Sequence, residues 1–149
     1  MQIAMCEARK GIIEGQSPFG ACIVKNGKVV VSAHNTVWKD TDATRHAEMN
    51  AIKKACKKLK TIKLSGCTIY STTEPCPMCF TAIHWAGMSR IVYGATIEDS
   101  AKFGFGELHV SNHALAAHQQ NKIQLKERFM RKESIELFKE WKAHKGKKY

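Results

Sequence analysis

Residues 21–31 read ACIVKNGKVVV and contain the strongest local fold signal in the chain. Two runs rich in β-branched residues flank Asn26-Gly27, a dipeptide that two-residue hairpin turns favour because both positions adopt positive φ. The stretch therefore predicts an antiparallel hairpin with strands at 21–24 and 29–31.

The segments on either side of this hairpin alternate between helical and extended patterns. Apolar side chains at helical spacing predict helices at 1–15, 46–60, 76–86, 98–103 and 134–142. Short apolar or alternating runs predict strands at 68–71, 90–95 and 123–129, with polar loops at 36–45 and 72–75. A hairpin followed by helix–strand–helix–strand predicts an α/β fold. We expect three α/β/α layers, with a mixed sheet of about five strands, in one domain over residues 1–149.

Length and cysteine content narrow the class of protein. The chain of 149 residues is long enough to bury a core without disulfide support. It has no apolar run of signal or membrane-span length, so we expect a cytoplasmic protein with no membrane partner. Of its six cysteines, Cys76 and Cys79 form the one close pair, which favours metal binding or catalysis over a disulfide framework.

The net charge of +11 is the unusual bulk property. Residues 122–149 contain ten Lys/Arg and four Asp/Glu, and a second group of lysines occupies 53–60. A basic surface fits a nucleic-acid partner, acidic substrates or simple solubility, so charge alone does not decide among them.

Two short motifs contain residues with metal chemistry: His46-Ala47-Glu48 and Pro75-Cys76-Pro77-Met78-Cys79. Cysteines three residues apart at a helix start share one face, and the helix N-terminus favours their thiolate forms. His46 begins the other helix and can meet both sulfurs. Two thiolates and an imidazole predict a Zn²⁺ site with an open fourth position for water. Glu48 would stand beside that water and accept its proton.

The cysteine pair has two other interpretations. A structural zinc site would need a fourth ligand, for which Cys67 or His84 could be proposed, and a redox pair would need neither His46 nor Glu48. Because both motifs are present together, the catalytic interpretation is favoured.

His-Ala-Glu followed by Pro-Cys-x-x-Cys resembles the signature of zinc-dependent nucleobase deaminases. The chain is similar to the cytidine deaminase-like superfamily over essentially residues 1–149, and most similar to bacterial guanine deaminases, with tRNA adenosine deaminases next. The guanine branch is favoured by SPFGA at 17–21, AIHWA at 82–86, GFGE at 104–107 and the terminal Lys148-Tyr149.

The resemblance implies a role for each candidate residue. It implies one Zn²⁺ held by His46, Cys76 and Cys79, catalytic roles for Glu48 and Glu107, and substrate contacts from Asn35, Phe19, Trp85 and Tyr149. Glu107 would replace an aspartate that assists proton transfer. Tyr149 would reach the partner's site in a homodimer that exchanges residues 122–149. Without the resemblance, Phe19 and Trp85 read as core aromatics, Asn35 as a turn residue, Glu107 as an exposed acid and Tyr149 as a free terminus.

The implied activity is zinc-dependent hydrolytic deamination of a small-molecule nucleobase, converting guanine to xanthine and ammonia. The alternatives are the wobble adenosine of tRNA, cytosine or another aminated ring. A third functional hypothesis is a non-enzymatic zinc module whose basic face binds nucleic acid. Three departures from the family pattern, Glu107, Arg45 and His84, bear on the substrate.

Overall fold

The computed structural model describes residues 1–119 and 123–148. Its strands are β1 (Gly20–Lys25), β2 (Lys28–His34), β3 (Cys67–Thr73), β4 (Arg90–Ala95) and β5 (Gln124–Lys126). Its helices are α1 (Gln2–Ile13), α2 (Val37–Asp40), α3 (Ala47–Leu59), α4 (Pro77–Trp85), α5 (Ile97–Ala101), α6 (Asn112–Ala117) and α7 (Arg131–Ala143).

The five strands form one mixed sheet in the order β2-β1-β3-β4-β5. β1 is antiparallel to both β2 and β3, whereas β4 is parallel to β3 and β5. The predicted hairpin is present, with φ of 50° at Asn26 and 72° at Gly27 in its turn. The mixed five-stranded sheet predicted from the sequence is confirmed.

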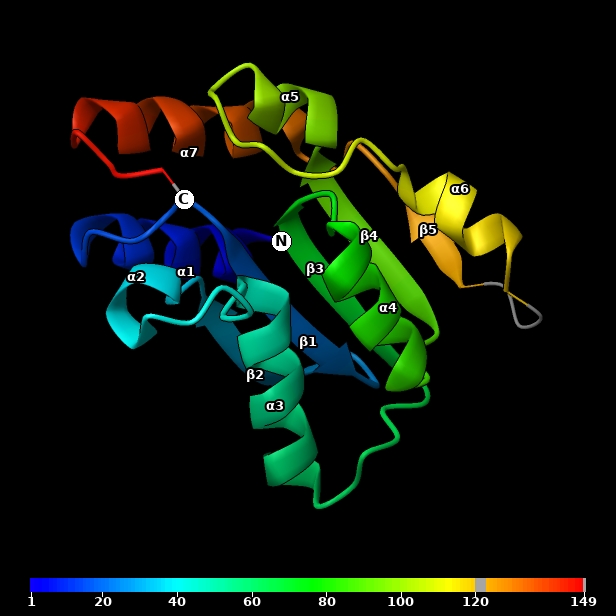
Figure 1. Ribbon diagram of the computed structural model, residues 1–149. Helices are drawn as coiled ribbons and strands as arrows, with labels where there is room; N and C mark the ends of the chain where they lie inside the picture. Colours follow the sequence, from blue (N-terminus) through cyan, green and yellow to red (C-terminus); the bar gives the residue numbers. More distant parts are fainter. Residues whose placement is uncertain (120–122, 149) are drawn as a thin grey trace.

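Helices cover both faces of this sheet, as Figure 1 shows. α1 and α7 pack on one face, and α3 and α4 pack on the other. Two glycines allow the first pair to come close: a Cβ at Gly20 would collide with the backbone of α1, and one at Gly94 would collide with Ser134 of α7. The predicted three-layer α/β/α arrangement is therefore confirmed.

The core between the sheet and α3 follows the strand register. Ile23 of β1 pairs with Ile69 of β3, which pairs with Ile91 of β4, and all three side chains are fully buried. Alanines of α3 pack against them, because small side chains let the helix backbone approach the sheet. α3 and α4 contact each other on this face of the sheet, and the candidate site lies at their N-terminal ends.

Several predicted boundaries were wrong. The polar loop at 36–45 contains the short helix α2, and β3 continues through Thr73 into the predicted loop at 72–75. The strand predicted over 123–129 is limited to 124–126, and α7 starts at Arg131, three residues before the predicted helix. Helix α6 was not predicted, because its six residues are too few to give a periodic pattern. No described helix has the length and apolar character needed to cross a membrane.

Candidate active site

Two helix N-termini on the same face of the sheet bring the metal-binding motifs together. His46 is the N-cap residue of α3, and Cys76 is the N-cap residue of α4, which follows β3 after residues 74–76. Both residues have extended backbone, and Pro77 occupies the first turn of α4, where its missing N–H is not needed. Cys79 lies one turn along α4, so both sulfurs face the histidine.

The three side chains have the spacing that a zinc ion requires. The Sγ atoms of Cys76 and Cys79 each lie 3.6 Å from Nδ1 of His46, and the three ligand atoms all lie within 4.8 Å of one another. Zn–N and Zn–S bonds of about 2.0 and 2.3 Å in a tetrahedral site would place the nitrogen about 3.5 Å from each sulfur. This agreement shows that the residues fit Zn²⁺ as their cofactor.

Within the described part of the chain, this metal-binding group has three members. Cys67 and His84, considered above as fourth ligands, do not belong to it. Nδ1 of His84 instead accepts a 2.8 Å hydrogen bond from the side-chain amide of Gln119. The fourth coordination position is therefore not filled by any of the described His, Cys, Asp or Glu side chains.

The cysteines differ in their protonation. A hydrogen bond from the Cys79 thiol, assisted by His46, lowers the pKa of Cys76 to about 4. The same hydrogen bond raises the pKa of Cys79, and burial raises it further. Cys76 is therefore a thiolate at neutral pH, which is the form that binds a metal.

Glu48 lies beside the three ligands on the first turn of α3. Its side chain is 6% exposed, and burial raises its pKa. Oε1 accepts a 2.8 Å hydrogen bond from the Ser71 hydroxyl, and Oε2 lies 3.5 Å from Sγ of Cys79. A buried carboxylate with a raised pKa is suited to accept and return a proton next to the metal position.

A cavity of about 370 Å³ opens onto the ligands. It is lined by Ala43, His46, Cys76, Pro77, Met78, Phe105, Gly106, Glu107 and Leu108. Oε2 of Glu107 is buried and has no hydrogen-bond partner among the described residues. Burial, together with the charges of Cys76 and Glu48, raises the pKa of Glu107 to about 8. The cavity therefore offers an acidic group and apolar walls to a flat ligand.

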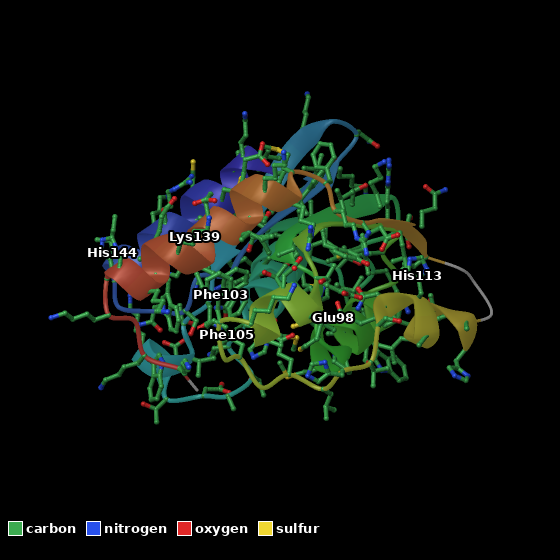
Figure 2. The ribbon with its side chains drawn as sticks, turned by 90° about the horizontal axis from the view of Figure 1, so that it is seen from above. Glu98, Phe103, Phe105, His113, Lys139 and His144 are labelled. Carbon is green, nitrogen blue, oxygen red and sulfur yellow. The ribbon has the colours of Figure 1, made fainter. Side chains whose placement is uncertain are left out.

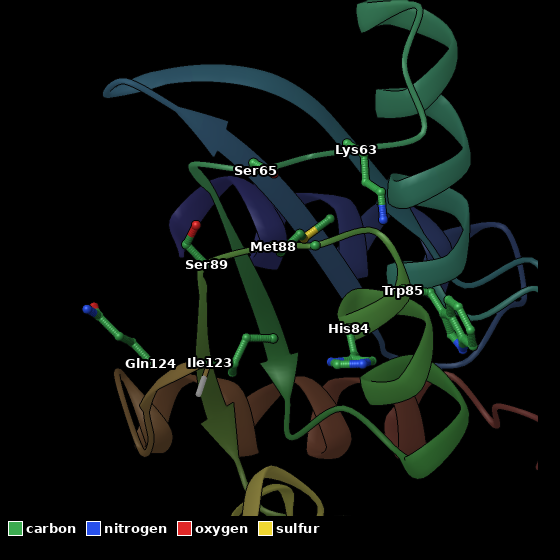
Figure 3. A pocket seen from close by; sticks show the side chains of 9 residues that line it. Lys63, Ser65, His84, Trp85, Met88, Ser89, Ile123 and Gln124 are labelled. Carbon is green, nitrogen blue, oxygen red and sulfur yellow. The ribbon is translucent and has the colours of Figure 1, made fainter. Parts of the chain in front are cut away.

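The substrate-binding residues implied by resemblance are not among the described residues that line this cavity. Phe19 is buried behind the cavity wall, with its ring centroid 4.9 Å from that of Phe105. Asn35 is fully buried, and its Oδ1 accepts a 3.1 Å hydrogen bond from the Val37 N–H. Trp85 is 74% exposed and lines a different cavity of about 660 Å³ with His84 and Lys63 (Figure 3). Tyr149 lies outside the described residues.

Ser71 is a site residue that the sequence reasoning missed. Cys67, Ile69 and Ser71 point to the same face of β3, the one that meets α3, and all three are buried. A serine at an inward position of this strand was the available signal, because a buried hydroxyl needs a partner.

The aromatic residues around the cavity connect it to α7. Phe103 stacks on Phe138 of α7 with centroids 5.0 Å apart, and Phe105 lies 4.9 Å from Trp141 of the same helix. Figure 2 shows Phe103 and Phe105 next to each other along this helix. The end of the chain crosses toward α2, where Trp38 Nε1 donates a 3.2 Å hydrogen bond to the carbonyl of Lys147. The C-terminal segment thus packs on its own chain in this structure.

The known proteins to which this chain is similar include deaminases named for different bases. Residues 1–95 match the family described as "Cytidine and deoxycytidylate deaminase zinc-binding region". The chain is 44% identical to guanine deaminase of Bacillus subtilis (strain 168) over 102 residues, 68% of this chain and 64% of that protein. It is 42% identical to a tRNA-specific adenosine deaminase of Aquifex aeolicus (strain VF5) over 95 residues, 64% of this chain and 63% of that protein.

A solved structure of guanine deaminase from Nitrosomonas europaea superposes with a TM-score of 0.88 at 26% identity, covering 95% of this chain and 82% of that one. The match therefore spans just under two thirds of each of the two curated relatives and most of the solved one.

Proposed function

Because the chain belongs to the cytidine and deoxycytidylate deaminase zinc-binding family, we propose that it removes the exocyclic amino group of a nucleobase by hydrolysis. The favoured substrate is guanine, which would give xanthine and ammonia. The observation that carries this proposal is the buried carboxylate of Glu48 beside three ligands with an open metal position. A structural zinc site has no use for such a carboxylate.

His46, Cys76 and Cys79 would hold the zinc ion. When bound, Zn²⁺ would supply a Lewis acid that makes a water molecule a nucleophile at neutral pH. Glu48 accepts the proton released from water at Oε2, because Oε1 is held by Ser71. It then delivers this proton to the ring nitrogen next to the attacked carbon and assists the departure of ammonia.

Glu107 would act on the base from the wall of the same cavity. Burial favours the protonated form of this carboxyl, and its Oε2 has no described partner to compete with a ligand. A purine presents ring N–H and nitrogen groups that can exchange a proton or a hydrogen bond with this carboxyl. Met78, Phe105 and Leu108 supply apolar surface for the faces of the ring.

Two observations favour guanine over other bases as the substrate: the named relatives of the chain, and the Glu107 carboxyl in the cavity. The chain shares 44% identity with a protein named guanine deaminase, and it resembles the guanine branch at 17–21, 82–86 and 104–107. The substrate roles of Asn35, Phe19, Trp85 and Tyr149 stay predictions, as do the homodimer, the exchange of residues 122–149 and the cytoplasmic location. A single deaminase domain over 1–149 is also part of the proposal.

The second candidate is deamination of adenosine in tRNA. The charge of +11 and the 42% identity to a tRNA-specific adenosine deaminase favour it. Part of that charge is engaged within the fold, because Lys54 and Lys58 donate hydrogen bonds to carbonyl groups of β2.

One experiment compares the two substrates. Purified zinc-loaded protein is assayed for ammonia release from guanine, adenine, cytosine and their nucleosides, and for inosine formation in transcript tRNA. We expect turnover of guanine that disappears in Glu48→Ala. Inosine formation in tRNA with little turnover of free guanine would replace guanine by the second candidate, and zinc-containing protein without activity on any of them would refute the deaminase proposal.

A further inference from the structure

The carboxylate of Glu74 connects the starts of two helices. Glu74 lies between β3 and α4, two residues before Cys76, and is 4% exposed. Its Oε1 accepts a 2.8 Å hydrogen bond from the backbone N–H of Asn112, and its Oε2 accepts a 3.3 Å bond from that of Ile97. Ile97 and Asn112 are the first residues of α5 and α6. The first N–H groups of a helix have no partner within it, so one carboxylate satisfies both helix starts.

Residues 97–112 therefore form a loop whose two ends meet at one side chain. Figure 1 shows this segment running from α5 above α4 to α6. Two further bonds fix the same base: the Asn112 Nδ2 donates to the carbonyl of Pro75 at 2.6 Å, and the Glu74 N–H donates to the carbonyl of Ala95 at 2.8 Å. We name these contacts of Glu74 and Asn112 the clasp.

The clasp connects the segment of the metal ligand Cys76 to the loop that contains Glu107. Phe105, buried against Phe19 and Trp141, anchors the loop on one side of Glu107. Residues 108–111 on the other side are exposed, and the next buried anchor is Asn112. The position of the Glu107 carboxyl relative to Cys76 is therefore set by two anchors, Phe105 and the clasp, and the clasp is bonded directly to the segment that carries Cys76.

We propose that Glu74 is a positioning residue that holds Glu107 over the metal-binding group by joining both ends of residues 97–112 to the Cys76 segment. The catalytic consequence rests on the proposed function, in which Glu107 acts on the substrate. The structural consequence does not depend on it.

The first test measures the loop itself. Hydrogen–deuterium exchange of zinc-loaded protein is compared between wild type, Glu74→Gln and the control Glu133→Gln, an exposed glutamate on α7 that gives the same charge change. In Glu74→Gln the new side-chain amide would turn an N–H toward one of the two backbone donors. We expect amides of 106–112 to exchange about tenfold or more faster in Glu74→Gln only, with the zinc content unchanged. Unchanged exchange in this stretch would overturn the proposal.

The second test asks whether Glu74 acts through Glu107. Rates of base deamination are measured for Glu74→Gln, Glu107→Gln and the double variant. If Glu74 acts by placing Glu107, its substitution should lower kcat/KM in the wild type but by less than about twofold in the Glu107→Gln background. Fully additive losses would show that Glu74 has a general structural role instead.

A second variant covers the case in which Glu74→Gln does not fold. Asn112→Ala removes the bond to the Pro75 carbonyl but leaves the carboxylate and its backbone partners. We expect the same faster exchange over 106–112 and the same non-additivity with Glu107→Gln, and its absence would again overturn the proposal. If wild-type protein deaminates no base, the proposed function fails, while the exchange experiment still decides on the clasp.

Discussion

The hydroxyl of Ser71 donates a 2.8 Å hydrogen bond to Oε1 of Glu48, from β3 to α3 across the buried face of the sheet. Both side chains are almost completely enclosed, so this hydroxyl replaces the water that would otherwise solvate the carboxylate. The bond also leaves Oε2 as the oxygen nearest the metal ligands, 3.5 Å from Sγ of Cys79. Ser71 therefore orients the group that we assign to proton transfer.

Replacing Ser71 by alanine should lower activity and stability together. Glu48 would lose its hydrogen-bond donor in a buried site, which should lower the unfolding free energy by about 1–3 kcal/mol. The carboxylate would also lose its orientation, which should lower kcat about tenfold or more. Ammonia release and urea unfolding measure the two effects. Ser65→Ala, at an exposed position, is the control, and wild-type kcat in Ser71→Ala would contradict the assigned orientation.

Cys76→Ser should abolish stoichiometric zinc binding, because a serine hydroxyl is not deprotonated at neutral pH as the thiolate of Cys76 is. Elemental analysis measures the zinc per chain. Substitution by Co²⁺ should give thiolate charge-transfer absorption in wild type that is reduced in the variant. Cys6→Ser, at an exposed cysteine, should retain both signals. A full complement of zinc in Cys76→Ser would remove that cysteine from the site.

The parts of the fold that the sequence predicted are those with a local cause. Asn26-Gly27 determines its hairpin by its own backbone preference, and the two helix starts are marked by His46 and by Pro77. The elements α2 and α6 span four and six residues, too few to give a periodic pattern. α6 begins where the Ser111 hydroxyl accepts from the Ala114 N–H and where Glu74, distant in sequence, accepts from Asn112. A bond across 38 residues cannot be read from periodicity.

The residues of the candidate site also divide into those that local motifs predicted and those that depend on distant contacts. His46, Glu48, Cys76 and Cys79 lie in two short motifs at helix starts, so the predicted layers alone bring them together. Glu107 reaches the cavity through a loop without regular structure, and its role was inferred from resemblance. Trp85 points to another cavity of this chain, since the end of α4 lies a full helix length from Cys76. Ser71 was missed because its role depends on the register between β3 and α3.

The pair formed by Asp99 and Arg131 should make stability depend on acid pH. Burial alone would raise the pKa of Asp99, but two hydrogen bonds from Arg131, at 2.7 and 2.6 Å, and one from the Thr96 N–H lower it to about 2. The folded pKa lies below the ordinary value of 3.8, so the stabilisation is complete above about pH 4 and is lost as pH falls toward about 2.

Asp99→Asn should therefore reduce the unfolding free energy at pH 7 by about 2 kcal/mol and flatten its dependence between about pH 4 and pH 2. Urea unfolding across this range measures both changes. Glu136→Gln, which breaks an exposed pair with Lys139, should have a much smaller effect. An acid dependence of Asp99→Asn equal to that of the wild type would show that another carboxylate controls it.

The lysines of α3 include two that protect the free edge of the sheet. β2 is an edge strand, and Lys58 Nζ donates a 2.7 Å hydrogen bond to the Val30 carbonyl, while Lys54 Nζ donates a 3.4 Å bond to the Ser32 carbonyl. Unpaired edge carbonyls can pair with the edge of another chain, and lysines commonly block this pairing.

The double variant Lys54→Ala/Lys58→Ala should therefore self-associate as concentration rises, as measured by light scattering. Lys53→Ala/Lys57→Ala removes the same charge from exposed positions of the same helix and should not. Equal association of both pairs would mean that loss of net charge, rather than exposure of the β2 edge, is the cause.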